Sequence, residues 1–370
     1  MKQHLLILLG IIILLNACGH KTDEQDNTSV IDLNENSVTV MGTQLEQSVL
    51  NGIPDVFNKA FDQEYLKSII RDNSIVNSSL DADFGKEYFE SNFHIGDEMV
   101  ELVNNGGDFK FVQYYFDENH QNHHIVFRSY NDFVLNFYDY IVDTLNNKLV
   151  IKDGFIYNTG TNFSDNIREN VLLMALNKTN PEGITLTLSN IKANFDGQKY
   201  KEALRLLREH QTELKDLSCY WQLYIATLYQ TCPKESFLDS LNALGEKNID
   251  RRMLQLHQLI FSLNEGKTEI AQNTINELIE QTGDDPIYLM MFGKANFYAK
   301  NYKDALICYE TSEQYLPPLW DLWYGKLECL DALNDKENFV KCLNSAINNY
   351  KMSKEELTEL TKKHFPKMAK

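Results

Sequence analysis

An alanine or a phenylalanine recurs every 34 positions in the second half of this 370-residue chain, at Ala203, Phe237, Ala271, Ala305 and Phe339. Four residues after each of these stands a large apolar side chain: Leu207, Leu241, Ile275, Tyr309 and Leu343. A fixed period of this length predicts one helix–turn–helix unit repeated along the chain. Because each unit buries its apolar face only against its neighbours, residues 184–353 are expected to stack five such units into an elongated all-α array.

The fourth unit shows the pattern most fully. Its successive key positions resemble the tryptophan, glycine, tyrosine, alanine, aromatic and proline of the tetratricopeptide (TPR) family: Leu289, Gly293, Tyr302, Ala305, Tyr309 and Pro317. The resemblance implies a solenoid with a concave surface that grips another polypeptide. The second and fifth units depart from it, with Phe237 and Phe339 at the small-residue position. An unrelated helical bundle with accidental spacing is the alternative.

The array is expected to end in a capping helix. Ser353 followed by Glu356 is a capping-box pattern, which predicts that a helix begins there and that residues 354–370 form a capping helix and tail.

The N-terminus carries an export signal. Residues 1–17 contain one lysine and an apolar run from Leu5 to Leu15, too short for a membrane-spanning helix but typical of a signal peptide. The run ends in Leu15-Asn16-Ala17-Cys18, which resembles the lipobox of bacterial lipoproteins. That resemblance implies diacylation of Cys18 and a membrane lipid anchor. An ordinary secretory signal with a coincidental cysteine is the alternative.

The residues after Cys18 bear on the location of the protein. Residues 18–43 are expected to form a flexible acidic tether. Because position 19 is not the aspartate of an inner-membrane retention signal, the resemblance implies an outer-membrane lipoprotein of a Gram-negative bacterium. The acidic residues Asp23, Glu24 and Asp26 leave open whether it faces the periplasm or is surface-exposed.

The charge of the chain is uneven. Residues 18–183 contain 11 Lys and Arg against 27 Asp and Glu, whereas residues 184–370 contain 23 against 26. An acidic first half repels phosphate backbones, so no nucleic-acid partner is expected.

Residues 44–160 show a different sequence pattern, which predicts an α+β domain. Helical periodicity over 44–72 is broken near Pro54, and Asp81 can cap a further helix that continues to Val103. Four aromatic, strand-like runs follow at 109–116, 124–130, 133–142 and 149–157, and their short connections indicate an antiparallel four-stranded meander. This order of elements resembles the NTF2-like (SnoaL-like) cone, although another small α+β fold remains open. Residues 161–183 are expected to form a helix that links this domain to the TPR solenoid.

Few residues suggest chemistry. The common nucleotide-binding, hydrolase and metalloprotease motifs do not occur, and no cofactor or metal is expected. His120, His123 and His124 lie around one expected hairpin and fit an exposed turn better than a metal site. The five cysteines of the repeats show no zinc spacing and are expected to be buried free thiols. A disulfide between Cys308 and Cys342, which stand one period apart, is the alternative. Asp139 can face the interior of the α+β domain as a pocket carboxylate, or close a hydrogen bond at the sheet edge.

These features predict a non-catalytic envelope lipoprotein that binds a protein or peptide through the TPR groove. In TPR proteins the first helix of each unit lines that groove, which here gives an apolar and aromatic stripe: Phe195, Tyr229, Leu256, Met290, Phe297, Tyr298 and Tyr324. The same rings can instead belong to the repeat core or contact the N-terminal domain. Two other functions stay open, namely a small-ligand-binding or enzymatic protein with its pocket in the NTF2-like domain, and a glycan-capture lipoprotein.

Overall fold

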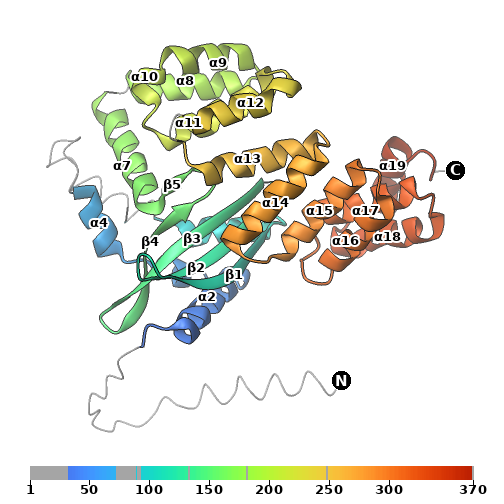
Figure 1. The fold of residues 1–370 in the computed structure, drawn as a ribbon, viewed down its shortest axis with the longest axis horizontal. Coiled ribbons are helices and arrows are strands. Elements are labelled where there is room, and N and C mark those ends of the chain that lie inside the picture. The colour runs from blue at the N-terminus through green and yellow to red at the C-terminus, as the bar shows by residue number, and fades with distance from the viewer. Residues whose placement is uncertain are drawn as a thin grey trace, which may run out of the picture.

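The computed structural model describes residues 32–71, 89, 93–131, 134–180, 182–246 and 249–368. The expected signal peptide, Cys18 and Asp81 lie outside these residues. Within them, an antiparallel sheet with its own helices is followed by a long helical part that lies over the sheet (Figure 1).

The chain enters the fold in helices that cover one face of the sheet. Asn34 and Ser37 form a capping box that begins the first of them, and Pro54 begins the second at the position where proline is best tolerated. The helices are α2 (Glu35–Leu50), α3 (Pro54–Asn58), α4 (Gln63–Arg71) and α6 (Ile95–Asn104).

The expected tether is therefore too long. Residues 35–43, assigned to it from their polarity, belong to α2. Val38, Met41, Leu45 and Val49 recur at helical spacing and are buried against the sheet, so this apolar stripe overrides the polar residues between them.

The sheet is a meander with neighbours paired in chain order, and every pair is antiparallel. The four expected strands are found with boundaries close to those expected, and a short fifth strand follows. Asn146 and Asn147 both have positive φ and make the two-residue turn between the third and fourth strands. The strands are β1 (Asp108–Asp117), β2 (Asn122–Asn131), β3 (Val134–Leu145), β4 (Lys148–Ile156) and β5 (Thr161–Asn162).

The segment expected to link the two parts is α7 (Phe163–Thr179). It does more than link, because Phe163, Ile167 and Val171 are buried in the same core as α2 and α3. This core, on one face of the sheet, is filled by aromatic rings, most of which meet edge to face or tilted, while Phe109 and Phe127 stack. Phe57 lies 5.7 Å from both Phe109 and Phe127, measured between ring centroids.

The rest of the described chain is a row of helix pairs. Each pair is antiparallel and packs against the next, and α10 (Gln211–Leu214) is a short insertion between the first and second pairs. The pairs are α8 (Ile184–Asp196) with α9 (Tyr200–Glu209), α11 (Ser218–Thr231) with α12 (Lys234–Gly245), α13 (Arg251–Asn264) with α14 (Thr268–Thr282), α15 (Pro286–Tyr298) with α16 (Tyr302–Ser312), and α17 (Trp320–Ala332) with α18 (Lys336–Asn349).

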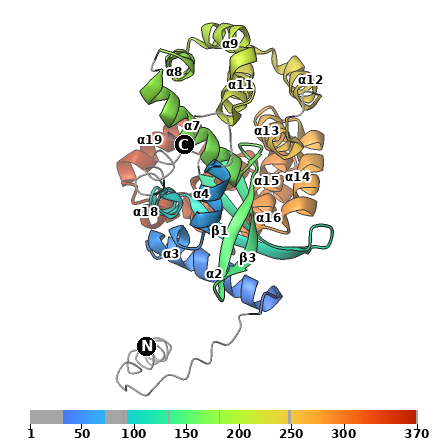
Figure 2. The same ribbon diagram turned by 90° about the vertical axis from the view of Figure 1, so that its left-hand side faces the viewer.

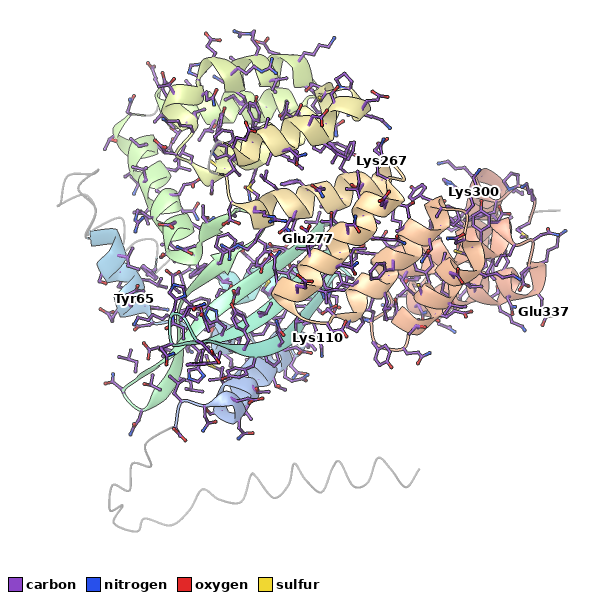
Figure 3. All side chains as sticks on the ribbon, viewed as in Figure 1. Tyr65, Lys110, Lys267, Glu277, Lys300 and Glu337 are labelled. Carbon is purple, nitrogen blue, oxygen red and sulfur yellow. The ribbon has the colours of Figure 1, made fainter. Side chains whose placement is uncertain are left out.

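The 34-residue period is a structural period. Each of Ala203, Phe237, Ala271, Ala305 and Phe339 is the fourth residue of the second helix of its pair, and all are at most 2% exposed. Gly293 shows why small residues matter here, since a Cβ atom at this position would lie 3.1 Å from the ring of Tyr309. The charged side chains Lys267, Lys300 and Glu337, by contrast, lie on the outside of the array and are exposed (Figure 3).

The expected capping helix is confirmed. Ser353 and Glu356 form the capping box of α19 (Lys354–His364), and Leu357 is buried against the last pair.

The sheet lies between two helical layers. In Figure 2, α3 and α4 lie on one side of the strands and α13 to α16 lie on the other. The face turned toward the array contributes Phe137 and Tyr130 to a core shared with α13, α15 and α17, and the ring of Phe137 stacks on Tyr288 at 5.9 Å.

One buried ionic cluster crosses this junction. Arg128 on β2 is fully buried and donates to Asp108 on β1 at 2.6 Å and to Asp285 at 3.1 Å. Asp285 is the N-cap of α15, where it also accepts from the backbone of Ile287. Burial alone lowers the pKa of Arg128, but the two carboxylates outweigh it and raise that pKa, so the arginine stays charged.

Replacing Arg128 tests this junction. We expect Arg128→Met to lower the free energy of unfolding by about 3–5 kcal/mol, because two buried carboxylates lose their counter-charge. Arg205→Met is the matched control, since Arg205 pairs with Glu202 and Glu209 on the exposed surface of one helix. Chemical denaturation measures both variants. Equal midpoints for the Arg128 variant and the parent would show that the cluster does not hold the two parts together.

Candidate functional site

The first helices of the pairs form the inner face of the array, and much of that face is covered by the sheet. Leu256 on α13 and Met290 on α15 are only 2% and 4% exposed and belong to the core shared with the sheet. Their expected place in an open groove is therefore wrong. Their sequence positions indicated the inner face but not the strands that lie on it.

Three other expected groove residues pack within the array. Phe195 lies 5.3 Å from Tyr200, and Phe297 lies 5.4 Å from Tyr302, so each closes the turn of its own helix pair. Tyr229 packs edge to face on neighbouring phenylalanines. These rings are half-buried and stabilise the repeats.

The inner face remains open along α15 and α17. Tyr298 is 42% exposed, and Tyr324 is half-buried beside Trp320. Burial raises the pKa of both tyrosines, and the charge of Glu328 adds to that effect. We call Lys294, Tyr298, Tyr324 and Glu328 the α15–α17 stripe. Each helix contributes two of them one turn apart.

The charges of this stripe are partly removed from water. Burial lowers the pKa of Lys294, and the nearby Asp321 and Glu328 oppose that shift. Burial raises the pKa of Glu328, and Lys294 opposes it. Because attraction between charges grows as water is excluded, a partner that covers the stripe strengthens this attraction.

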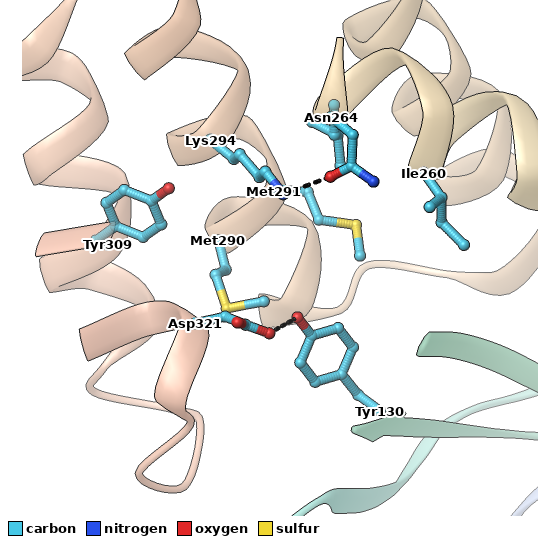
Figure 4. A pocket seen from close by; sticks show the side chains of 9 residues that line it. Tyr130, Ile260, Asn264, Met290, Met291, Lys294, Tyr309 and Asp321 are labelled. Carbon is cyan, nitrogen blue, oxygen red and sulfur yellow. Dashed lines mark hydrogen bonds between the residues drawn. The ribbon is translucent and has the colours of Figure 1, made fainter. Parts of the chain in front are cut away.

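A small cavity lies at the inner end of the stripe (Figure 4). Its volume is about 30 Å³, enough for about two water molecules but not for a cofactor. Tyr130 donates a hydrogen bond of 2.5 Å to Asp321, which ties β2 to α17, and Lys294 donates to Asn264 at 2.9 Å. Met290 and Met291 supply the apolar wall.

Asp139 lies on the array-facing side of the sheet, opposite the aromatic core, so it is not a pocket carboxylate of the domain interior. Its carboxylate accepts from the Tyr115 hydroxyl at 2.6 Å and pairs with His124 Nδ1 at 2.8 Å. The rings of Tyr115 and His124 stack at 4.5 Å. Burial, followed by the charge of Asp139, raises the pKa of Tyr115. The sequence left open a hydrogen bond at the sheet edge for Asp139; the carboxylate does accept hydrogen bonds, but on β3, which is paired with β2 and β4 on both sides.

The other chemical groups are scattered. His120 pairs with Asp117, and His123 with the hydroxyl of Tyr114, so the three histidines do not converge on one point. In the part of the chain that is described, no three metal-ligating side chains come together. The five repeat cysteines are free, as expected. Among the described helices, none has the length and apolar character needed to cross a bilayer.

Sequence reasoning missed the residues that join the two parts. Arg128 stands within an apolar strand, which is a signal for a buried charge that needs a partner. Asp285 directly precedes Pro286, an N-cap pattern that predicts the start of α15. Neither signal predicts that the side chains of Arg128 and Asp285 form an ion pair.

Comparison of the chain with protein-family models, with curated proteins and with solved structures finds no match. The function is therefore inferred from the geometry of the fold.

Substitutions distinguish covered from open positions of the inner face. We expect Leu256→Ala to lower the free energy of unfolding by about 2–5 kcal/mol, because it leaves a cavity under the sheet. Tyr298→Ala should change it by less than about 1 kcal/mol, since much of that ring is in water. Urea titration measures both. A Leu256 variant as stable as the Tyr298 variant would mean that the sheet does not seal this face.

Proposed function

We propose that the protein is a non-catalytic, lipid-anchored envelope protein that docks a protein or peptide partner on the α15–α17 stripe of a TPR-like array. The observation that carries the proposal is the match between sequence period and helix pairs. Residues 34 apart occupy the same buried position in five successive second helices. Repeats of this kind build extended binding surfaces and contribute no reacting group of their own.

The state of the α+β domain favours docking over catalysis. An enzymatic or ligand-binding role in an NTF2-like cone needs an open interior with a polar group in it. Between the sheet and the described helices, that space is filled by rings such as Phe57, Phe61, Phe127 and Tyr140, which lie 5.4–6.4 Å apart between centroids. The carboxylate on which such a role depended, Asp139, lies on the opposite face.

The stripe has the composition of a protein-binding surface. Tyrosines are enriched among the residues that dominate binding energy, and Tyr298 and Tyr324 stand on adjacent helices. Lys294 and Glu328 between them can orient a partner segment through one donor and one acceptor. A segment with an apolar anchor flanked by polar groups of both kinds fits this arrangement.

Anchoring is proposed at Cys18 in the outer membrane, facing either the periplasm or the cell exterior. The 16 residues from 19 to 34 separate that cysteine from α2. Fully extended they span at most about 55 Å, so the folded part stays within that distance of the bilayer.

Acylation is tested directly. Cys18→Ser should abolish incorporation of labelled palmitate and release the protein from the membrane fraction, because the thiol that carries the lipid is gone. Cys232→Ser, which removes a half-buried thiol of the array, is the matched control and should label normally. Unchanged labelling of the Cys18 variant would refute a lipid anchor at this position.

Docking is tested by capture from detergent-solubilised membranes of the native host. We expect a partner that co-purifies with the parent to be lost, at least tenfold, from Tyr298→Ala/Tyr324→Ala, since these rings supply the anchors. The matched control is Ile307→Ala/Val340→Ala, which trims exposed apolar residues from second helices on the outside.

Quantitative mass spectrometry reads out the capture, and thermal melting verifies that each variant is folded. A partner retained by the tyrosine variant but lost from the control would place docking on the outer helices instead.

A further inference from the structure

A second hollow lies where the sheet meets the start of the array. It has a volume of about 420 Å³ and is formed by three segments far apart in sequence, residues 159–161, 215–221 and 249–253. This volume is within the range of small-molecule sites, which occur preferentially where structural units meet. We call it the α11–α13 cleft. It shares no lining residue with the α15–α17 stripe.

The walls of the cleft are held in place by hydrogen bonds between helices and loops. Gln222 on α11 donates to the carbonyl of Asn158 at 3.1 Å, which fixes the loop after β4. Glu169 on α7 accepts from the backbone amides of Ser218 and Cys219 at 2.7 and 3.1 Å, which fixes the start of α11. A site held in this way loses little conformational entropy when a ligand enters.

One wall is an oriented aromatic ring. The indole N–H of Trp221 donates to the carbonyl of Lys215 at 2.7 Å, and the ring packs edge to face on Tyr220 and Tyr224. Trp221 is half-buried, so part of its apolar surface remains available in the cleft. The buried side chains of Leu217 and Met253 extend this apolar surface.

The polar wall is rich in acceptors. The hydroxyls of Thr159 and Thr161 lie 3.0 Å apart, and Thr159 also donates to a backbone carbonyl, so lone pairs on both remain to accept. Asp216 adds an exposed carboxylate, which can only accept. Such a wall fits a ligand with several hydroxyl donors.

The charges of the cleft cancel. Asp250 is neutralised by Arg252, whose guanidinium donates to it at 3.0 and 3.1 Å. Lys215 and Asp216, adjacent in sequence and both exposed, balance each other. The net charge of these four side chains is zero, so a ligand with a net charge gains no net electrostatic attraction here.

We infer that the α11–α13 cleft binds an uncharged, polyhydroxylated ligand with one apolar face, which is the chemistry of a neutral saccharide. The C–H face of the sugar ring packs on Trp221, its hydroxyls donate to Asp216 and the threonines, and Lys215 donates to a ring or hydroxyl oxygen. This site is independent of the proposed docking surface, so either can fail without the other.

Fluorine NMR of the full mature chain labelled with fluorotryptophan tests the site. The chain has three tryptophans, and Trp221→Phe assigns the resonance of Trp221 by its disappearance. The probes are glucose, galactose, mannose and N-acetylglucosamine, with glucuronate and glucosamine as charged analogues. We expect at least one neutral sugar to shift the Trp221 resonance saturably, with a Kd of about 1 mM or tighter, and to leave those of Trp320 and Trp323 in place.

Variants identify the groups that bind. Asp216→Ala should weaken this Kd at least tenfold, whereas Asp239→Ala, which removes another exposed aspartate, on α12, should not change it. Asp216 is on the surface, so its loss leaves the fold intact, and thermal melting verifies this. The inference is overturned if no neutral sugar shifts the resonance at about 100 mM, if a charged analogue binds as tightly as its neutral counterpart, or if Asp216→Ala binds like the parent.

Discussion

The arrangement of the whole molecule depends on the buried contact of Arg128 with Asp108 and Asp285. A guanidinium in a dry interior is tolerated only with charged partners at fixed positions, so it accepts one placement of α15 relative to β1 and β2. Apolar contacts such as that of Phe137 with Tyr288 stabilise the junction but are not directional. The hydrogen bonds of the ionic cluster are directional, so they fix the position of α15 relative to the strands. The neighbouring bond from Tyr130 to Asp321 extends the same constraint to α17.

This constraint changes what the helical array can do. A solenoid of helix pairs ordinarily leaves its inner face free, but here strands of the same chain occupy the face at Leu256 and Met290. The sheet thus takes the place that a partner would otherwise have. We propose that binding takes place at the margins of the junction, at the α15–α17 stripe on one side and the α11–α13 cleft on the other.

Local and periodic features could be predicted from the sequence, and contacts between the two parts could not. The 34-residue spacing identified the buried position of each second helix, Ser353 the last helix, and short connections the meander. These depend on residues near in sequence or at a fixed period. The junction has no period, so nothing marked Leu256 as covered or paired Arg128 with Asp285. Polar composition also concealed the first turns of α2, whose helix is stabilised by a narrow stripe around Val38.

Both candidate sites follow from the same physical condition. Inside the junction Asp285 is buried, and its carboxylate accepts from Arg128 and from the backbone of Ile287. At its margins the array curves away from the sheet, and side chains such as Lys294 and Trp221 are only half covered. A ligand can therefore reach the ring of Trp221, which the hydrogen bond from its indole N–H to Lys215 already orients. A side chain that is oriented before binding loses little conformational entropy when a ligand arrives. The margins of the junction therefore combine side chains in fixed positions with access from solvent. The buried core lacks the access, and the outer helices lack the fixed surroundings.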